Sequence, residues 1–146
     1  MKKSVLVAIL LFILAGSVTA VSAQAKRLWT SPKAGIWRVN ATDEEKEVWY
    51  GRMTLTRKTN GKYRGYFYWI SSDKTTSGRE YFNGSFDRKT GKLLLKAYAV
   101  KNIKGELGIG NYLAAVNKRG RNIPHGKWSG GESIPGIWSA VWLKAK

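Results

Sequence analysis

The chain has no cysteine and a single histidine, His125, among its 146 residues. Without cysteine the fold has no disulfide framework, so it must be held together by a packed core. A catalytic thiol and a metal site of the Cys/His kind are excluded on the same ground. A lone histidine in a strand is more often a packed or surface residue than a catalyst. We therefore expect a protein that is not an enzyme and that uses neither a cofactor nor a metal.

Acidic residues are also scarce: nine Asp and Glu stand against 26 Lys and Arg, for a formal net charge of +17 at pH 7. A field of that sign attracts nucleic acid, anionic lipid, acidic polysaccharide or an acidic protein. The alternative interpretation is that the charge only keeps the protein soluble. Four of the acids form one cluster without the ligand spacing of a calcium loop, so they are expected to form a solvated acidic loop: Asp43, Glu44, Glu45 and Glu47.

The N-terminal 25 residues have the pattern of a secretory signal peptide. Lys2 and Lys3 precede an unbroken apolar run over residues 5–15, which is short for a bilayer span, and small residues with A-x-A-like spacing follow. We predict cleavage of residues 1–25 and a secreted or periplasmic mature chain, 26–146, forming one domain; an uncleaved membrane anchor is the alternative. No cysteine follows the run, which excludes a bacterial lipid anchor. Export also argues against sequence-specific nucleic-acid binding.

Beyond the apolar run, no segment has a long helical period. Short apolar and aromatic runs alternate with turn clusters, which is typical of antiparallel β structure. We predict eight strands, over residues 36–39, 48–56, 63–70, 79–86, 93–100, 108–116, 122–128 and 137–143. Closure into an eight-stranded, up-and-down, all-β barrel removes both exposed edges of the sheet. A two-sheet β-sandwich is the alternative, because the first strand is short and Pro124 lies in the seventh.

Three connections between the strands are tight turns. Asn60-Gly61 predicts a type I′ hairpin, Gly91 is placed for a left-handed turn, and residues 117–121 form the third. The other four connections are longer, at residues 40–47, 71–78, 101–107 and 129–136. Alternate hairpins of an up-and-down barrel lie at opposite ends. The tight turns therefore share one end and the long loops share the other.

This topology separates the charges. Around the tight turns there are ten basic residues and one acid, Asp87. Eight of the ten are candidate anion-binding residues: Arg57, Lys58, Lys62, Arg88, Lys89, Lys118, Arg119 and Arg121. The long-loop end takes the other eight acids: Asp43, Glu44, Glu45, Glu47, Asp73, Glu80, Glu106 and Glu132. One hypothesis is a cationic binding or inhibitory module for an anionic polymer or acidic protein. The alternative is that Lys and Arg simply solvate hairpin tips.

Three short motifs stand out, at Gly35-Ile36-Trp37, residues 61–66 and residues 81–87. They resemble motifs of the calycin barrels, the lipocalins and avidins. Gly35-Ile36-Trp37 is similar to the G-x-W that opens those barrels, residues 61–66 resemble an avidin-type hairpin exit, and residues 81–87 resemble a later strand. The resemblance covers most of the mature chain in layout. It implies a barrel closed near its N-terminus and open at the long loops. The polar set with which avidins bind biotin has no match, so biotin is not implied.

The resemblance also implies a structural cluster at the closed end. If the first and last strands pair, Trp37 should approach Trp142. In lipocalins a basic residue of the last strand packs on the G-x-W indole, and Lys144 is the candidate here. These three residues, Trp37, Trp142 and Lys144, are predicted to form the floor of the barrel.

Large aromatic residues gather at the open end once the topology is imposed. The candidate ligand-binding residues are Trp49, Trp69, Tyr112, Trp128 and Trp138. Their rings supply apolar contact area, and each indole N–H could fix the orientation of a ligand. We expect a small apolar, aromatic or sugar-like ligand. The alternatives are that the aromatic side chains fill the interior outright, or that the barrel is a subunit of a larger cell-surface assembly.

Overall fold

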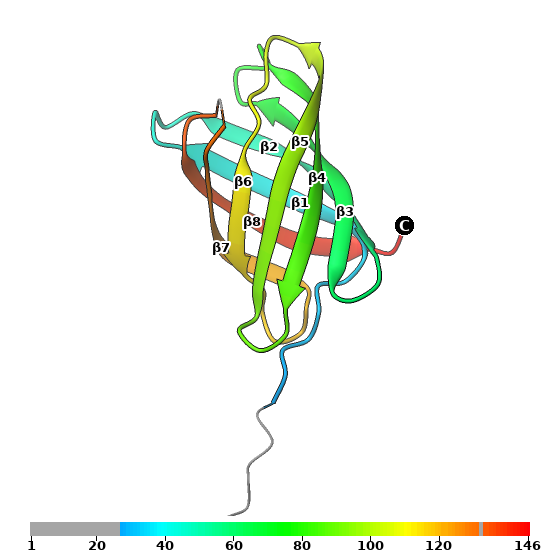
Figure 1. The fold of residues 1–146 in the computed structure, drawn as a ribbon. Helices are drawn as coiled ribbons and strands as arrows, with labels where there is room; N and C mark the ends of the chain where they lie inside the picture. The colour runs from blue at the N-terminus through cyan, green and yellow to red at the C-terminus, as the bar shows by residue number, and fades with distance from the viewer. Residues whose placement is uncertain (1–26, 132) are drawn as a thin grey trace, which may run out of the picture.

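The fold, seen in a computed structural model that describes residues 27–131 and 133–146, is a closed antiparallel β-barrel (Figure 1). Each strand pairs with its neighbours in the chain, and the last pairs with the first. The strands are β1 (Gly35–Asp43), β2 (Val48–Arg57), β3 (Lys62–Ser71), β4 (Ser77–Asp87), β5 (Lys92–Lys104), β6 (Asn111–Ala115), β7 (Asn122–Ser129) and β8 (Gly136–Lys144). The predicted eight-stranded barrel is confirmed and the sandwich alternative is wrong. The predicted signal peptide, 1–25, and Glu132 lie outside the described residues.

The tight turns have the backbone conformations that their sequences predict. Asn60 and Gly61 both have positive φ, 55° and 68°, as a type I′ hairpin requires. Gly91 has φ 74°, and the turn before it is held by the Asp87 carboxylate, which accepts hydrogen bonds from the Lys89 N–H and the Thr90 hydroxyl. These turns fix the register of the hairpins on either side.

Among the described residues, no helix is long and apolar enough to cross a bilayer.

Pro124 is accommodated by a bulge. The register between β7 and β8 shifts between Ile123 and Gly126, so that the intervening residues leave the regular ladder. Proline has no N–H to donate, and bulges are among the few places where a sheet tolerates it. His125 lies in the same bulge and is exposed. The proline therefore does not prevent closure of the barrel.

The boundary between β5 and β6 differs from the prediction. β5 extends to Lys104, but β6 begins only at Asn111, which pairs with Lys96. The protruding end of β5 pairs with β4 alone. Residues 108–110, predicted as strand, instead approach the open end of the barrel, where the Gly110 N–H donates to a buried carboxylate. A tertiary contact, rather than local propensity, decides this boundary.

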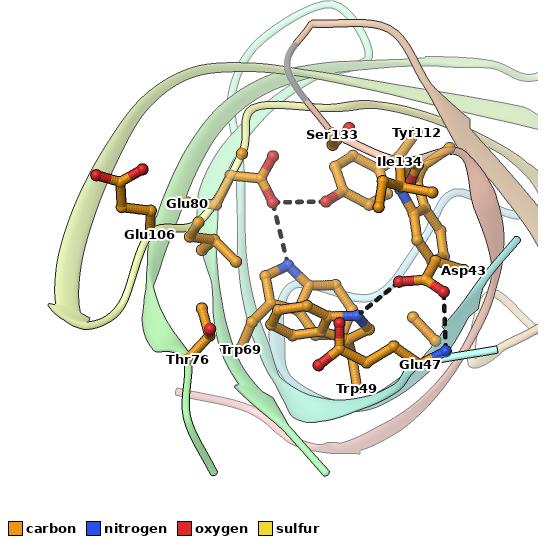
Figure 2. Close-up of a pocket in the computed structure, with 14 residues that line it drawn as sticks. Asp43, Glu47, Trp49, Trp69, Thr76, Glu80, Glu106, Tyr112, Ser133 and Ile134 are labelled. Atoms are coloured by element: carbon orange, nitrogen blue, oxygen red, sulfur yellow. Dashed lines mark hydrogen bonds between the residues drawn. The ribbon is translucent and has the colours of Figure 1, made fainter. Parts of the chain in front are cut away.

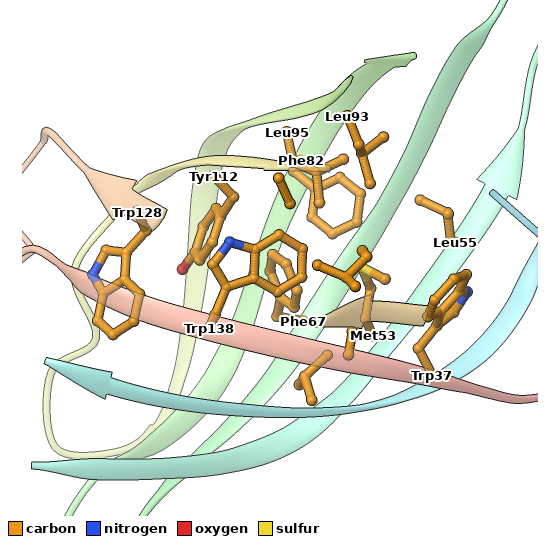
Figure 3. Packing of buried hydrophobic residues seen from close by; sticks show 14 of the residues in the cluster. Trp37, Met53, Leu55, Phe67, Phe82, Leu93, Leu95, Tyr112, Trp128 and Trp138 are labelled. Atoms are coloured by element: carbon orange, nitrogen blue, oxygen red, sulfur yellow. The ribbon is translucent and has the colours of Figure 1, made fainter. Parts of the chain in front are cut away.

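The interior is a packed core from the tight-turn end to the middle of the barrel (Figure 3). The largest side chains there are essentially inaccessible to solvent: Trp37, Met53, Leu55, Phe67, Phe82, Leu93, Leu95 and Ile123. Phe67 is central, with ring centroids 4.9 Å from Phe82 and 4.6 Å from Tyr112. This half of the barrel interior leaves no room for a ligand, so a site inside the barrel must lie on the open-end side of Phe67.

A non-strand segment, residues 27–34, closes the tight-turn end. The Trp29 N–H donates to the Arg88 carbonyl (2.8 Å), and the Lys33 N–H donates to the Gly120 carbonyl (2.9 Å). Pro32 is fully buried, and its carbonyl accepts a hydrogen bond from the Tyr63 hydroxyl (3.1 Å). The barrel floor is therefore built by the N-terminal segment as well as by strand residues.

Of the three residues predicted for the floor, Trp37 and Trp142 lie side by side and Lys144 lies apart from them. Trp37 and Trp142 are register partners on β1 and β8, and their indole N–H groups donate to the carbonyls of the N-terminal segment. Trp37 is fully buried, whereas Trp142 is half-buried. Lys144 pairs with Ile36 at the last rung and is exposed. The cation that lies over an indole here is Arg121, 5.0 Å from the ring centroid of Trp142.

Candidate functional site

A cavity of about 240 Å³ opens at the long-loop end of the barrel (Figure 2). We call it the cup. Its lining combines aromatic, acidic and small side chains from the mouth-facing ends of the strands and from the loops: Ala41, Asp43, Glu47, Trp49, Trp69, Thr76, Glu80, Glu106, Leu107, Gly108, Tyr112, Trp128, Ser133 and Ile134. The barrel interior is thus neither empty nor completely filled. A packed lower half supports a cavity at the mouth.

Four of the five predicted ligand-binding residues line the cup: Trp49, Trp69, Tyr112 and Trp128. Tyr112 lies between two of the indoles, with ring centroids 6.5 Å from Trp69 and 6.3 Å from Trp128. The Trp69 and Tyr112 rings are nearly parallel, at 19°. Strand alternation aims these side chains inward, and the shared open end brings them together.

Trp138, the fifth, lies in the layer beneath the cup. Only 2% of its surface is exposed, and it meets Phe67 and Tyr112 edge-on. Its Nε1 faces Gly126 of the neighbouring strand, where a Cβ would lie only 2.2 Å from that nitrogen. The glycine therefore leaves the space that the indole occupies. Trp138 supports the wall of the cup and is not part of its lining.

The indole N–H groups of the cup are already engaged by the protein. Trp69 donates to Glu80 (3.1 Å), Trp49 donates to Asp43 (3.4 Å), and Trp128 donates to the carbonyl of Ile134 (2.6 Å). The idea that these groups fix the orientation of a ligand therefore needs correction. The bonds orient the walls instead, and a ligand would meet ring surface.

Glu80 is the residue that the sequence interpretation missed. Only 1% of its surface is exposed, and its carboxylate accepts hydrogen bonds from Trp69 Nε1, the Tyr112 hydroxyl (2.5 Å) and the Gly110 N–H (2.8 Å). Burial raises the pKa of Glu80, and the three hydrogen bonds oppose that rise. The pKa of Tyr112 is raised well above its ordinary value, by its own burial first and then by the Glu80 charge. One carboxylate thereby links β3, β4, β6 and the loop that precedes β6.

A signal for Glu80 was present in the sequence. It lies two residues before Phe82 and shares the inward face of β4 with it. Charged residues are rarely fully buried without partners. An inward-facing acid among aromatic residues therefore predicts a hydrogen-bonded group at the site.

The acidic loop also contributes to the cup. Asp43 is buried, and its carboxylate accepts from the Glu47 N–H (2.8 Å) as well as from Trp49. Burial raises the pKa of Glu47, and the nearby charges of Asp43, Asp73 and Glu45 raise it further. The expectation of a wholly solvated loop is therefore wrong for Asp43, which is buried as part of the site. Glu44 and Glu45 are exposed, as expected.

The eight candidate anion-binding residues lie on the opposite end and are all exposed: Arg57, Lys58, Lys62, Arg88, Lys89, Lys118, Arg119 and Arg121. Three also contact the floor. Arg57 donates to the Tyr63 hydroxyl (3.3 Å), Arg88 donates to the Trp29 carbonyl (3.4 Å), and Arg121 lies over the Trp142 ring. They belong to three different turns, so they form a broad cationic end rather than a pocket.

No protein-family model matches the chain. No curated protein matches it in sequence either. Among solved structures it is similar to a redesigned β-barrel, mFAP1, bound to DFHBI, with a TM-score of 0.60 and 9% identity over 75% of this chain and 94% of that one. It is also similar to EF1p2_mFAP2b bound to DFHBI, with a TM-score of 0.58 and 10% identity over 76% of this chain and 93% of that one. At such low identity the likeness establishes the β-barrel fold alone.

Proposed function

We propose that this protein is an exported, non-enzymatic β-barrel that binds a small apolar or aromatic ligand in the cup. The observation that carries the proposal is a cavity walled by Trp49, Trp69, Tyr112 and Trp128 above a tightly packed apolar layer. Flat rings on several sides of a small cavity suit a flat or apolar molecule, because they give large contact area at fixed geometry.

The volume limits the ligand. Pockets for drug-sized molecules measure about 300–1,000 Å³, whereas the cup measures about 240 Å³. A one- or two-ring molecule fits this space better than a long lipid or an oligosaccharide. Two barrels of similar fold have each been solved with DFHBI bound, which supports ligand binding by such a barrel. The calycin-like layout of the strands supports it further.

Filling the cup tests the proposal. The mature chain and an Ala41→Phe variant are titrated with a panel of small aromatic compounds while the tryptophan fluorescence is followed. Ala41 lines the cup, so a phenyl ring there should occupy the ligand's space and abolish the response. Ala115→Phe is the matched control, because Ala115 is exposed on the outer face of β6. Equal responses of the two variants would contradict binding in the cup.

A second candidate function is binding of an anionic polymer or acidic protein at the cationic end. The observation in its favour concerns Asp87, the one acid among these turns. Its carboxylate is held by the Lys89 N–H and then by Thr90, and these bonds lower its pKa. The carboxylate is thus committed to its own turn, and the basic side chains around it are exposed. Such binding should weaken steeply with salt.

A further inference from the structure

The charge of the cup is opposite to that of the whole chain. Lys and Arg outnumber Asp and Glu by 26 to nine in the sequence. Yet the described residues that line the cup include four acids and no Lys, Arg or His: the acids are Asp43, Glu47, Glu80 and Glu106. A lining drawn at random from this composition would be basic. The reversal gathers four acidic side chains around one cavity of a strongly basic protein, an arrangement that favours a cationic ligand there.

The two most buried of these acids are held by uncharged donors. Within the described residues, the hydrogen bonds to Glu80 come from an indole, a phenol and a backbone N–H. Those to Asp43 come from an indole and a backbone N–H. Like-charge repulsion contributes to the raised pKa of Glu47, beside Asp43. A cation entering the cup would therefore relieve repulsion as well as gain attraction.

The aromatic walls suit the same ligand. A cation over an indole or phenol face within about 6 Å of its centroid is attracted by the ring quadrupole. Because the indole N–H groups donate to protein acceptors, the surfaces left to a ligand are ring faces and edges. The cup thus combines aromatic surface with carboxylates around it. Among the described residues no group of three or more acids is arranged to hold a metal ion, which favours an organic cation.

We propose that the ligand of the cup is a small organic cation, an ammonium group attached to an aromatic or short apolar body. The assignment rests on the proposed function of the cup and names its ligand class. The apolar body packs on Trp69 and Tyr112, above Phe67. The ammonium group lies on the loop side, near Glu47, which is less buried than Asp43 and Glu80.

Three probes that share one carbon skeleton test whether the cup prefers a positively charged ligand. The mature chain is titrated by calorimetry with 2-phenylethylamine, 2-phenylethanol and phenylacetate, which present a cationic, a neutral and an anionic group. The amine should bind at least about tenfold more tightly than the alcohol, and the acid should bind more weakly than both. An alcohol or acid that binds as tightly as the amine would overturn the cation assignment and leave the proposed function standing. Failure of all three probes to bind would overturn both.

Two double variants locate the effect. Glu47→Gln with Glu106→Gln removes two charges from the cup lining, and should weaken amine binding about tenfold while leaving alcohol binding unchanged. Glu44→Gln with Glu45→Gln removes two exposed charges of the same end that do not line the cup, and should leave both affinities unchanged. An equal loss of amine binding in both pairs would assign the effect to the general field of the loops and refute a charged site in the cup.

Discussion

At the scale of single residues, Glu80 determines how the cup is organised. Its carboxylate holds Trp69, Tyr112 and the Gly110 N–H at once, from three separate parts of the chain. A buried group of this kind is costly unless it is fully hydrogen-bonded, and once bonded it fixes the geometry of its partners. The orientation of two cup walls therefore depends on one side chain.

The raised pKa of Glu80 predicts a pH dependence of stability. Its ordinary value is 4.5, and burial raises it in the folded state. Between pH 4.5 and the higher pKa of the folded state, Glu80 keeps a proton that it has released in the unfolded chain. The free energy of unfolding therefore falls as the pH rises between these two values. Chemical denaturation at a series of pH values should show this fall in the native chain and a smaller one in Glu80→Gln.

Glu47 shares the direction of this shift and remains in both proteins, so the difference between them isolates Glu80. If the variant does not fold, the Glu80 carboxyl can be titrated directly by carbon NMR in the native chain. A midpoint at or below 4.5, or identical pH slopes of the two proteins, would contradict this account.

Gly126 tests the packing beneath the cup. A methyl group at this position would lie 2.2 Å from Trp138 Nε1, so Gly126→Ala must displace the indole. Overpacking of this kind costs about 1–3 kcal/mol in the free energy of unfolding. Thermal or chemical denaturation measures the loss, and Lys127→Ala, at an exposed neighbour, should change little. A Gly126→Ala protein as stable as the native chain would show that Trp138 is loosely packed.

At the scale of elements, the N-terminal segment is a structural part of the barrel although it forms no strand. The buried Tyr63 hydroxyl donates a hydrogen bond to the Pro32 carbonyl (3.1 Å), which links β3 to the N-terminal segment. Tyr63→Phe should lower the free energy of unfolding by about 1–3 kcal/mol, because a buried carbonyl loses its donor. Tyr98→Phe, at a side chain that is 59% exposed, is the control. Equal stability of the two variants would refute a bonded floor.

The sequence predicted elements better than it predicted their ends. Asn60-Gly61 and Gly91 mark turns through their own conformational freedom, and the strands between them follow from alternation. The start of β6 could not be found in this way, because the Gly110 N–H donates to the Glu80 carboxylate instead of joining the strand ladder. Glu80 lies 30 positions away in the sequence. The floor segment was missed for the same reason, since it has no periodic pattern and is held by long-range backbone bonds.

The site was predictable where topology alone decides position. Trp49, Trp69, Tyr112 and Trp128 lie near strand ends at the open side, so the strand count places them together. To place Trp138 beneath the cup, one must know how deep each residue lies along the barrel, and this depth depends on the strand register. To predict the indole hydrogen bonds, one must know where Asp43 and Glu80 lie relative to the rings. Only the closed barrel supplies those relations.

At the scale of the whole molecule, the ends of the barrel differ in charge and in form. One end has three tight turns with exposed Lys and Arg, and the other has an acid-lined cavity. The two candidate partners, an anionic polymer and a small organic cation, would therefore bind at opposite ends. Substitutions at one end should therefore leave binding at the other end unchanged.

Heparin retention tests the cationic end. Replacing Lys89, Lys118 and Arg119 with Gln should lower the salt concentration needed for elution, because these exposed side chains carry much of the positive charge of the tight turns. Ligand binding in the cup should be unchanged. Replacing Lys101, Lys104 and Lys127, which are exposed and outside the tight turns, is the matched control. Equal elution shifts for both sets would show that heparin retention depends on the net charge of the protein and not on the cationic end.

The central claim, that a small ligand occupies the cup, is tested most directly by the indole N–H signals of the seven tryptophans in a proton–nitrogen correlation spectrum. On addition of 2-phenylethylamine, the signals of the three cup tryptophans should shift together and saturably: Trp49, Trp69 and Trp128. Those at the other end should stay in place: Trp29, Trp37 and Trp142. Shifts confined to the second group, or no shift at any indole, would contradict the claim.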